Sequence, residues 1–134
     1  RLSACTGSML HLVKPLGFDM DDAKLRRAGL DYHDLAHVMV HESLDDALAQ
    51  VPGRIWALTG HATTMYADIS YADGDGLLFG RESVGLSEEA MNHSRVADRV
   101  RIQMVDGVRS LNLANSASIV LYEAWRQLGF PGGI

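Results

Sequence analysis

The stretch VRIQMVDGVRSLNLANSASIVLYEAWRQLG, residues 100–129, decides the fold class. It opens with an apolar-rich run from Val100 to Met104, which predicts a β-strand. A polar loop follows, and then apolar residues recur at helical spacing from Asn112 to the closing Gly129. A strand, a loop and a helix in this order predict one βα unit of an α/β domain.

The preceding part of the chain shows the same alternation of strands and helices. We expect further strands at residues 9–13, 37–41, 54–59 and 76–79. We expect one helix to begin at Asp21 and Asp22 and to end at Gly29. A second should be capped by Ser43 and reach Val51, and a short third should start at residues 87–89. The sequence therefore predicts a mainly parallel sheet with flanking helices.

Composition limits the class of protein further. The 134 residues suffice for one domain, which we expect to span residues 1–134. Apolar residues make up 47% and charged residues 22%, which excludes a disordered or collagen-like chain. The single cysteine, Cys5, excludes a disulfide scaffold and fits a reducing, cytoplasmic compartment. No apolar run has the ~18 residues that a membrane span requires.

The formal net charge of −5 taken alone argues against a nucleic-acid partner, because phosphates favour a basic surface. Two local clusters of positive charge oppose this. One contains Lys24, Arg26 and Arg27, and the other contains Arg95, Arg99 and Arg101. Local basic patches therefore remain compatible with RNA.

In a parallel α/β sheet, ligands bind beyond the carboxyl ends of the strands. The residues to inspect are therefore Thr59-Gly60, Gly80-Arg81-Glu82 and the stretch 105–112. Ser110 and Asn112 stand at the start of the last helix, where backbone N–H groups are free to bind a ligand. Ordinary capping by either side chain explains the same pattern, so both interpretations stay open here.

Three other motifs lead to no site. His33-Asp34-x-x-His37 resembles a zinc motif, but Asp34 is shorter than the usual Glu and the following Val38-Met39-Val40 resists helix, so we expect no metal. The glycines of residues 74–80 have the wrong spacing for a dinucleotide fingerprint, and a turn at 73–76 explains them. Ser83 lacks the first glycine of a nucleophile elbow.

Three segments together resemble motifs two and three of the SpoU (TrmH-type) branch of the SPOUT RNA 2′-O-methyltransferases. They are LLFGRESVGL at 77–86, VRIQM at 100–104 and RSLNLANSA at 109–117. The opening residues 1–7 look like the end of motif one. PLGF at 15–18, LRRAGLDY at 25–32 and YEAWRQ at 122–127 resemble the small bacterial TrmL subfamily, which methylates the ribose of the tRNA wobble nucleotide.

The resemblance implies an α/β fold with a deep C-terminal trefoil knot, a rare exception to the rule that chains are not knotted. It also implies a homodimer, S-adenosylmethionine as methyl donor and the tRNA anticodon loop as partner. The family's motif one starts with a strand and an Asn-Thr-Gly-Asn stretch ahead of the position of Arg1. Neither is in the printed sequence, and we expect both to belong to a longer chain.

The family's functional positions fall on specific residues of this chain. Arg1 falls on the motif-one arginine assigned to catalysis, and Glu82 and Asn112 fall on the polar positions of motifs two and three. The cofactor would be held by backbone and apolar groups at the knot loops. The expected cofactor-binding residues are Leu58, Thr59, Gly60, Gly80, Glu82, Ile102, Met104, Ser110, Leu111 and Leu113.

Because a sulfonium methyl group is already activated, positioning can supply most of the catalysis. The Arg1 guanidinium stays protonated at any physiological pH, so it cannot accept a proton as a base. We expect it instead to bind a phosphate and polarise the ribose hydroxyl. We expect Arg26, Arg27, Arg95 and Arg109 to contact RNA. Tyr122, Trp125 and Leu128 suit either a dimer face or plain core packing. A methyltransferase acting on ribosomal RNA and a non-catalytic cofactor-binding module are the alternative functions.

Overall fold

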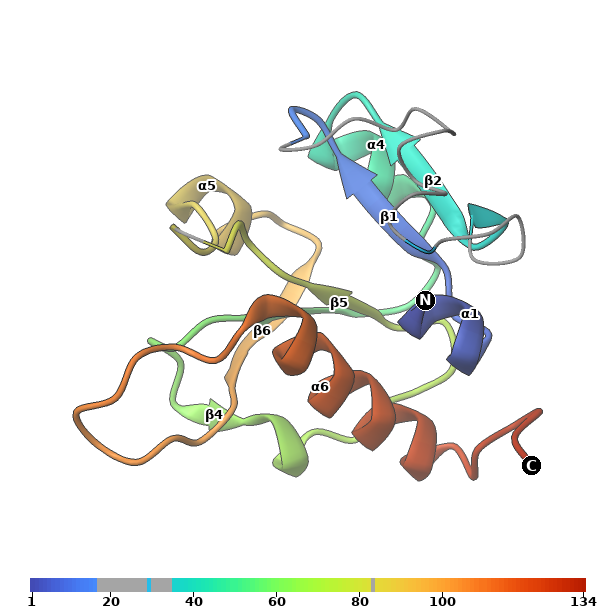
Figure 1. The fold of residues 1–134 in the computed structure, drawn as a ribbon. Helices are drawn as coiled ribbons and strands as arrows, with labels where there is room; N and C mark the ends of the chain where they lie inside the picture. Colours follow the sequence, from blue (N-terminus) through green and yellow to red (C-terminus); the bar gives the residue numbers. More distant parts are fainter. Residues whose placement is uncertain (17–28, 30–34, 83) are drawn as a thin grey trace. The chain divides into compact units, whose positions relative to one another are not determined.

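The computed structural model describes residues 1–16, 29, 35–82 and 84–134. The chain forms two compact units, which are described separately. The first comprises Arg1–Gln50 with Gly132–Ile134, and the second comprises Val51–Pro131. Figure 1 shows the course of the chain through both.

The first unit is built on a pair of short parallel strands. After helix α1 (Leu2–Thr6), strand β1 (Leu10–Val13) pairs with β2 (Val38–His41), and helix α4 (Leu44–Ala49) packs against both strands. The Ser43 hydroxyl accepts a hydrogen bond from the Asp46 amide at 3.1 Å, which confirms Ser43 as the N-cap of α4. Between the strands, His11 Nδ1 lies 2.8 Å from His41 Nε2. Burial and the neighbouring His41 lower the pKa of His11.

The second unit is a four-stranded sheet in which every pair is parallel. Its strands are β3 (Ile55–Leu58), β4 (Thr64–Met65), β5 (Gly76–Leu78) and β6 (Val96–Arg101), in the spatial order β4-β6-β3-β5. The 3₁₀ turn η1 (Tyr66–Asp68) follows β4, helix α5 (Glu88–Met91) precedes β6, and helix α6 (Leu113–Gln127) ends the unit. The parallel α/β architecture is therefore confirmed for this unit.

The core of the second unit lies between the sheet and α6. Val120 of α6 and Val100 of β6 are fully buried, and Trp56 and Tyr71 complete the central cluster. Figure 1 shows α6 running along the sheet. Burying apolar side chains of this size stabilises the fold by about 1.5–3 kcal/mol each, so this layer supplies much of the unit's stability.

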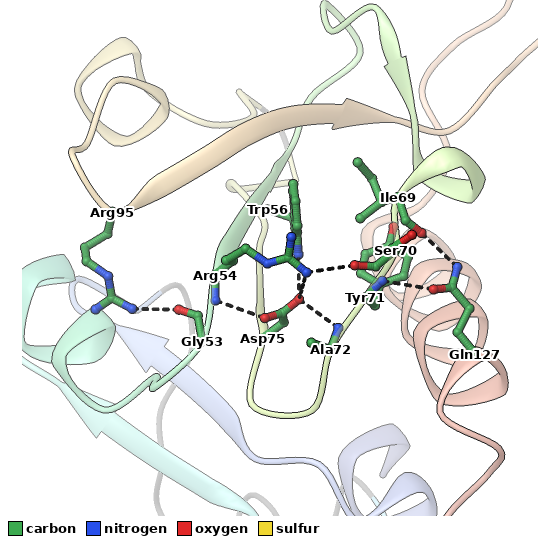
Figure 2. A network of polar contacts seen from close by, with 10 residues as sticks. All are labelled: Gly53, Arg54, Trp56, Ile69, Ser70, Tyr71, Ala72, Asp75, Arg95 and Gln127. Carbon is green, nitrogen blue, oxygen red and sulfur yellow. Dashed lines mark hydrogen bonds and ion pairs between the residues drawn. The ribbon is translucent and has the colours of Figure 1, made fainter.

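A polar network fastens the segment before β5 to its neighbours (Figure 2). The Asp75 carboxylate accepts hydrogen bonds from the Arg54 amide at 2.9 Å and from Trp56 Nε1 and the Ala72 amide at 3.0 Å each. Gln127 of α6 donates to the Ile69 carbonyl and accepts from the Tyr71 amide, both at 2.9 Å. The network therefore joins β3, the loop before β5 and the last helix.

Several expected boundaries were wrong. The last strand is Val96–Arg101, not 100–104, because pairing with β3 and β4 fixes its register and the chain leaves the sheet after Arg101. Helix α4 ends at Ala49, short of Val51. Helix α1, strand β4 and turn η1 were not predicted, since segments of two to five residues give little periodic signal. The expected helix at 21–29 lies outside the described residues apart from Gly29.

In the described part of the chain, no helix is long and apolar enough to cross a membrane. Among the described residues, no three His, Cys, Asp or Glu side chains are grouped so that they could hold a metal ion.

Candidate active site at the carboxyl edge of the sheet

The candidate site lies in the second unit, where β3, β5 and β6 end beside one another. Because the three strands are parallel neighbours, Leu58, Leu78 and Arg101 all stand at the same edge of the sheet. The Thr59 amide donates to the Val100 carbonyl at 2.9 Å and so ties the end of β3 to that of β6. The structure thus brings together the strand ends that the sequence analysis singled out.

Gly80 begins a tight turn after β5 and has no room for a side chain. A Cβ atom at this position would run into the backbone of Gly85 and Leu86. The Gly85 amide donates to the Arg81 carbonyl at 2.8 Å, and Gly85 itself has a left-handed backbone with a φ of 70°. Close packing of backbone on backbone therefore fixes the shape of the loop that carries Glu82.

The loop after β5 meets the start of α6 through two of the predicted catalytic residues. Asn112 Nδ2 donates to Glu82 Oε1 at 3.3 Å, while Asn112 Oδ1 accepts from the Asn115 amide at 3.2 Å. Asn112 is therefore both the N-cap of α6 and the partner of Glu82. Both side chains are exposed, so they remain accessible to a ligand.

The loop between β6 and α6 presents its backbone to the outside. Residues 102–111 belong to no helix or strand, and residues 103 and 105–111 are exposed. Val105, Val108 and Leu111 are nonetheless exposed apolar residues, with 77%, 55% and 40% of their surface accessible. Exposed peptide groups interleaved with apolar side chains suit a flat, partly apolar ligand with polar edges.

The ten predicted cofactor residues differ in their surroundings. Leu58 and Ile102 pack against the central core cluster and are partly buried, as are Thr59, Gly80, Met104 and Leu113. The exposed members are Gly60, Glu82, Ser110 and Leu111. All ten belong to the second unit.

Arg1, the third predicted catalytic residue, belongs to the first unit. It occupies the N-cap position of α1, and its guanidinium donates to the Gly29 carbonyl at 2.6 Å. The side chain is exposed.

The four arginines expected to contact RNA have different positions. Arg26 and Arg27 lie outside the described residues. Arg109 is exposed in the loop before α6. Arg95 is partly buried and donates to the Val51 and Gly53 carbonyls at 2.7 and 2.9 Å, the second of which is drawn in Figure 2. This structural use of Arg95 was not predicted, because the sequence does not show which carbonyls a side chain will reach.

A family model described as the SpoU rRNA Methylase family matches residues 1–122. The chain belongs to this family. A protein from Methylovorus glucosotrophus, named tRNA (cytidine(34)-2′-O)-methyltransferase, is 47% identical over 135 residues, covering 100% of this chain and 88% of that protein. The protein of the same name from Escherichia coli K12 is also 47% identical and is covered to 86%.

Two solved structures have a similar fold. One, described as giving structural insights into the 2-OH methylation of C/U34 on tRNA, is 40% identical, with a TM-score of 0.81 over 96% of this chain and 80% of that one. An AdoMet-bound rRNA methyltransferase from Sinorhizobium meliloti is 26% identical, with a TM-score of 0.79 over 96% of this chain and 49% of that one. The resemblance stated from motifs two and three is therefore confirmed.

Proposed function

We propose that this SpoU methylase is a tRNA (cytidine(34)-2′-O)-methyltransferase. It transfers a methyl group from S-adenosylmethionine to the ribose 2′-hydroxyl of the wobble nucleotide, in the anticodon loop of tRNA. Two relatives carrying this name, from Methylovorus glucosotrophus and Saccharophagus degradans, are 47% and 46% identical over 100% and 98% of the chain. Since tRNA is the substrate, we place the enzyme in the cytoplasm.

The observation that carries the proposal is the contact between Glu82 and Asn112. It joins the loop after β5 to the start of α6 at the carboxyl edge of the sheet, which is where an α/β domain binds its ligand. Glu82 and Asn112 are 30 positions apart in the chain and are held within hydrogen-bonding distance. Asn112 also directly follows the loop between β6 and α6. No metal is needed for this chemistry.

The residues present fit the cofactor. The loop 102–111 lies outside the helices and strands, so its exposed backbone groups can meet the polar edge of an adenine. Partly buried Leu58, Ile102 and Leu113 supply apolar walls. S-Adenosylmethionine supplies an activated sulfonium methyl group when bound. The chain's task is then to hold the acceptor hydroxyl in line with it.

Glu82 and Asn112 can position that hydroxyl. The Asn112 amide donates a hydrogen bond to Glu82 Oε1, whereas Glu82 Oε2 can accept one from the ribose hydroxyl. Arg1 remains our candidate for clamping a phosphate beside the nucleotide, because a guanidinium forms two parallel hydrogen bonds to a phosphate and cannot act as a base. An Arg1→Lys variant keeps the positive charge but cannot donate two parallel hydrogen bonds. We expect a large loss of rate, and full activity would refute the clamp.

RNA binding must act against the net charge of −5. We propose that exposed Arg109, together with Arg26 and Arg27, contacts phosphates, and we leave Arg95 out because backbone carbonyls already bind it. Neutralised phosphates release counterions, so affinity for tRNA should fall steeply between 50 and about 200 mM salt. An affinity that does not change with salt would contradict the proposed contacts.

We further propose that both units belong to one methyltransferase domain, residues 1–134, with the C-terminal trefoil knot of the SPOUT fold. The family model spans most of both units. We also propose a homodimer formed through the outer face of α6. Tyr122 and Phe130 are each 43% exposed and contact Trp125 edge to face, at 5.5 and 5.1 Å between ring centroids, which makes a compact aromatic surface.

A ribosomal RNA substrate is the second candidate, since the family model and the Sinorhizobium meliloti protein carry that description. The experiment incubates the enzyme with labelled S-adenosylmethionine and one of three RNAs, and measures the label in the RNA. The RNAs are a tRNA bearing cytidine 34, the same tRNA already 2′-O-methylated at that nucleotide, and ribosomal RNA. We expect label only in the first. Transfer to ribosomal RNA alone would overturn the proposed substrate, and transfer to neither RNA would favour a non-catalytic module.

A further inference from the structure

Two histidines face each other across the paired strands of the first unit. The parallel register sets Met39 beside His11, and His41 stands two residues beyond Met39 on the same face of the strand pair. The rings of His11 and His41 therefore lie diagonally across β1 and β2, with centroids 5.1 Å apart and planes tilted by 31°. His11 Nδ1 and His41 Nε2 are 2.8 Å apart, which is a hydrogen-bonding distance, and both residues are partly buried.

This hydrogen bond limits the number of protons that the pair can hold. One of the two facing nitrogens donates, and the other must keep its lone pair in order to accept. A neutral pair satisfies this condition, and so does a pair in which one ring is charged. When both rings are charged, both facing nitrogens carry hydrogen, and two positive rings repel each other at 2.8 Å. The closed pair therefore excludes a second proton, which the same histidines accept once they are apart.

The surrounding groups do not offset this repulsion. The other titratable groups on the described elements around the pair are Lys14, His37, Glu42, Asp45 and Asp46. The lysine and the glutamate pair with each other at 2.8 Å, and both aspartates are exposed on α4. His37 Nδ1 lies 3.2 Å from the Ser8 carbonyl. Burial is the larger cause of the lowered pKa of His11 and the neighbouring His41 is the other, so no carboxylate of the described residues counteracts them.

We infer that His11 and His41 form a proton-sensitive latch, which holds β1 to β2 at neutral pH and releases the two strands in acid. Separating the strands parts the rings and lets each of them take a proton. Because the native pKa of His11 lies below the unfolded value of about 6.5, the stabilisation is complete above that pH and is lost as the pH falls below it. One excluded proton favours opening by up to about tenfold for each pH unit. The latch is independent of the proposed function, because it concerns the first unit alone.

Hydrogen exchange of backbone amides measures the opening, with the full chain at pH 7.5 and at pH 5.5. This range lies above the pH at which carboxyl groups ordinarily titrate. The amides of Leu10 and Lys14 donate from β1 and its end to carbonyls of the neighbouring segment, at 2.7 and 3.0 Å, so both report on the strand contact. After correction for intrinsic exchange, we expect their protection factors to fall by about tenfold at the lower pH. The Thr59 amide, bound to the Val100 carbonyl in the second unit, is the internal control and should change by less than about twofold.

Two variants separate the pair from the other histidine of this unit that the structure describes. His11→Gln can still hydrogen-bond to His41 but takes up no proton, so protection of the two reporter amides should be the same at both pH values. His37→Gln is the matched control and should keep the tenfold fall. If His11→Gln does not fold, by circular dichroism, His41→Gln makes the same test, and the wild-type comparison needs neither variant.

A fall of less than about twofold in the wild type would overturn the inference. An equal fall at Thr59 would also overturn it, because the whole chain and not the strand pair would then be opening. The same holds if the fall persists in His11→Gln and disappears in His37→Gln, since the titrating group would then be His37.

Discussion

Removing the Asp75 carboxylate should destabilise the second unit without touching the candidate site. Only 6% of this side chain is exposed, and it accepts hydrogen bonds from Trp56 Nε1, the Ala72 amide and the Arg54 amide. In Asp75→Ala all three donors lose their acceptor. The partly buried Trp56 donor accounts for about 1–3 kcal/mol and the two more exposed amides for about 0.5–1.5 kcal/mol each, so we expect a loss on the order of 3 kcal/mol.

Urea denaturation followed by tryptophan fluorescence measures this loss, and thermal unfolding should show a fall of roughly 10 °C. Asp73→Ala is the matched control, because Asp73 lies in the same turn and is exposed. It should change the free energy of unfolding by less than about 0.5 kcal/mol. A loss below about 1 kcal/mol for Asp75→Ala, or an equal loss for Asp73→Ala, would refute the reasoning.

The same carboxylate predicts a pH dependence. Burial would raise the pKa of Asp75, but hydrogen bonds from Ala72, Trp56 and Arg54 outweigh it and lower the pKa below the ordinary value. The stabilisation is therefore complete above the unfolded-state pKa of about 3.9 and is lost as the pH falls through the lowered native pKa. Asp75→Asn should flatten the acid limb of the stability profile, and an unchanged limb would contradict this assignment.

Three further changes test other parts of the unit. Asn112→Ala removes the cap that accepts from the Asn115 amide and should cost about 1 kcal/mol in thermal unfolding, besides releasing the loop after β5; an unchanged melting temperature would contradict the cap. Gly80→Ala places a methyl group against the backbone of Gly85 and should abolish calorimetric binding of S-adenosylhomocysteine, whereas wild-type affinity would show that the turn is unimportant. Hydrogen bonds from the Arg126 and Gln127 side chains lower the pKa of Glu123 to about 2. The stabilisation by its carboxylate should therefore persist down to about pH 4 and be lost as the pH falls further. Titration of this carboxyl group by NMR near its ordinary pKa would refute this.

The parallel strands and the last helix could be predicted because their signals are local. Apolar runs that end at Gly60 and Gly80 indicated β3 and β5. Polar residues before a helical pattern indicated Ser110 or Asn112 as a cap, and the structure uses Asn112. Strand β6 was misplaced because Val96–Asp98 alternate poorly in polarity. Only pairing with β3 makes them a strand. The short β4 exists for the same reason, through its contact with the end of β6.

The candidate site divides in the same way. The sequence by itself determined the residue types at each strand end and the family to which they belong, since motifs two and three are contiguous segments. Only the tertiary structure decided that Glu82 meets Asn112 and that Arg95 is bound by backbone carbonyls. Local sequence encodes propensity and chemistry. The distance between two side chains far apart in the chain depends on how the sheet and its loops pack, which no local pattern contains.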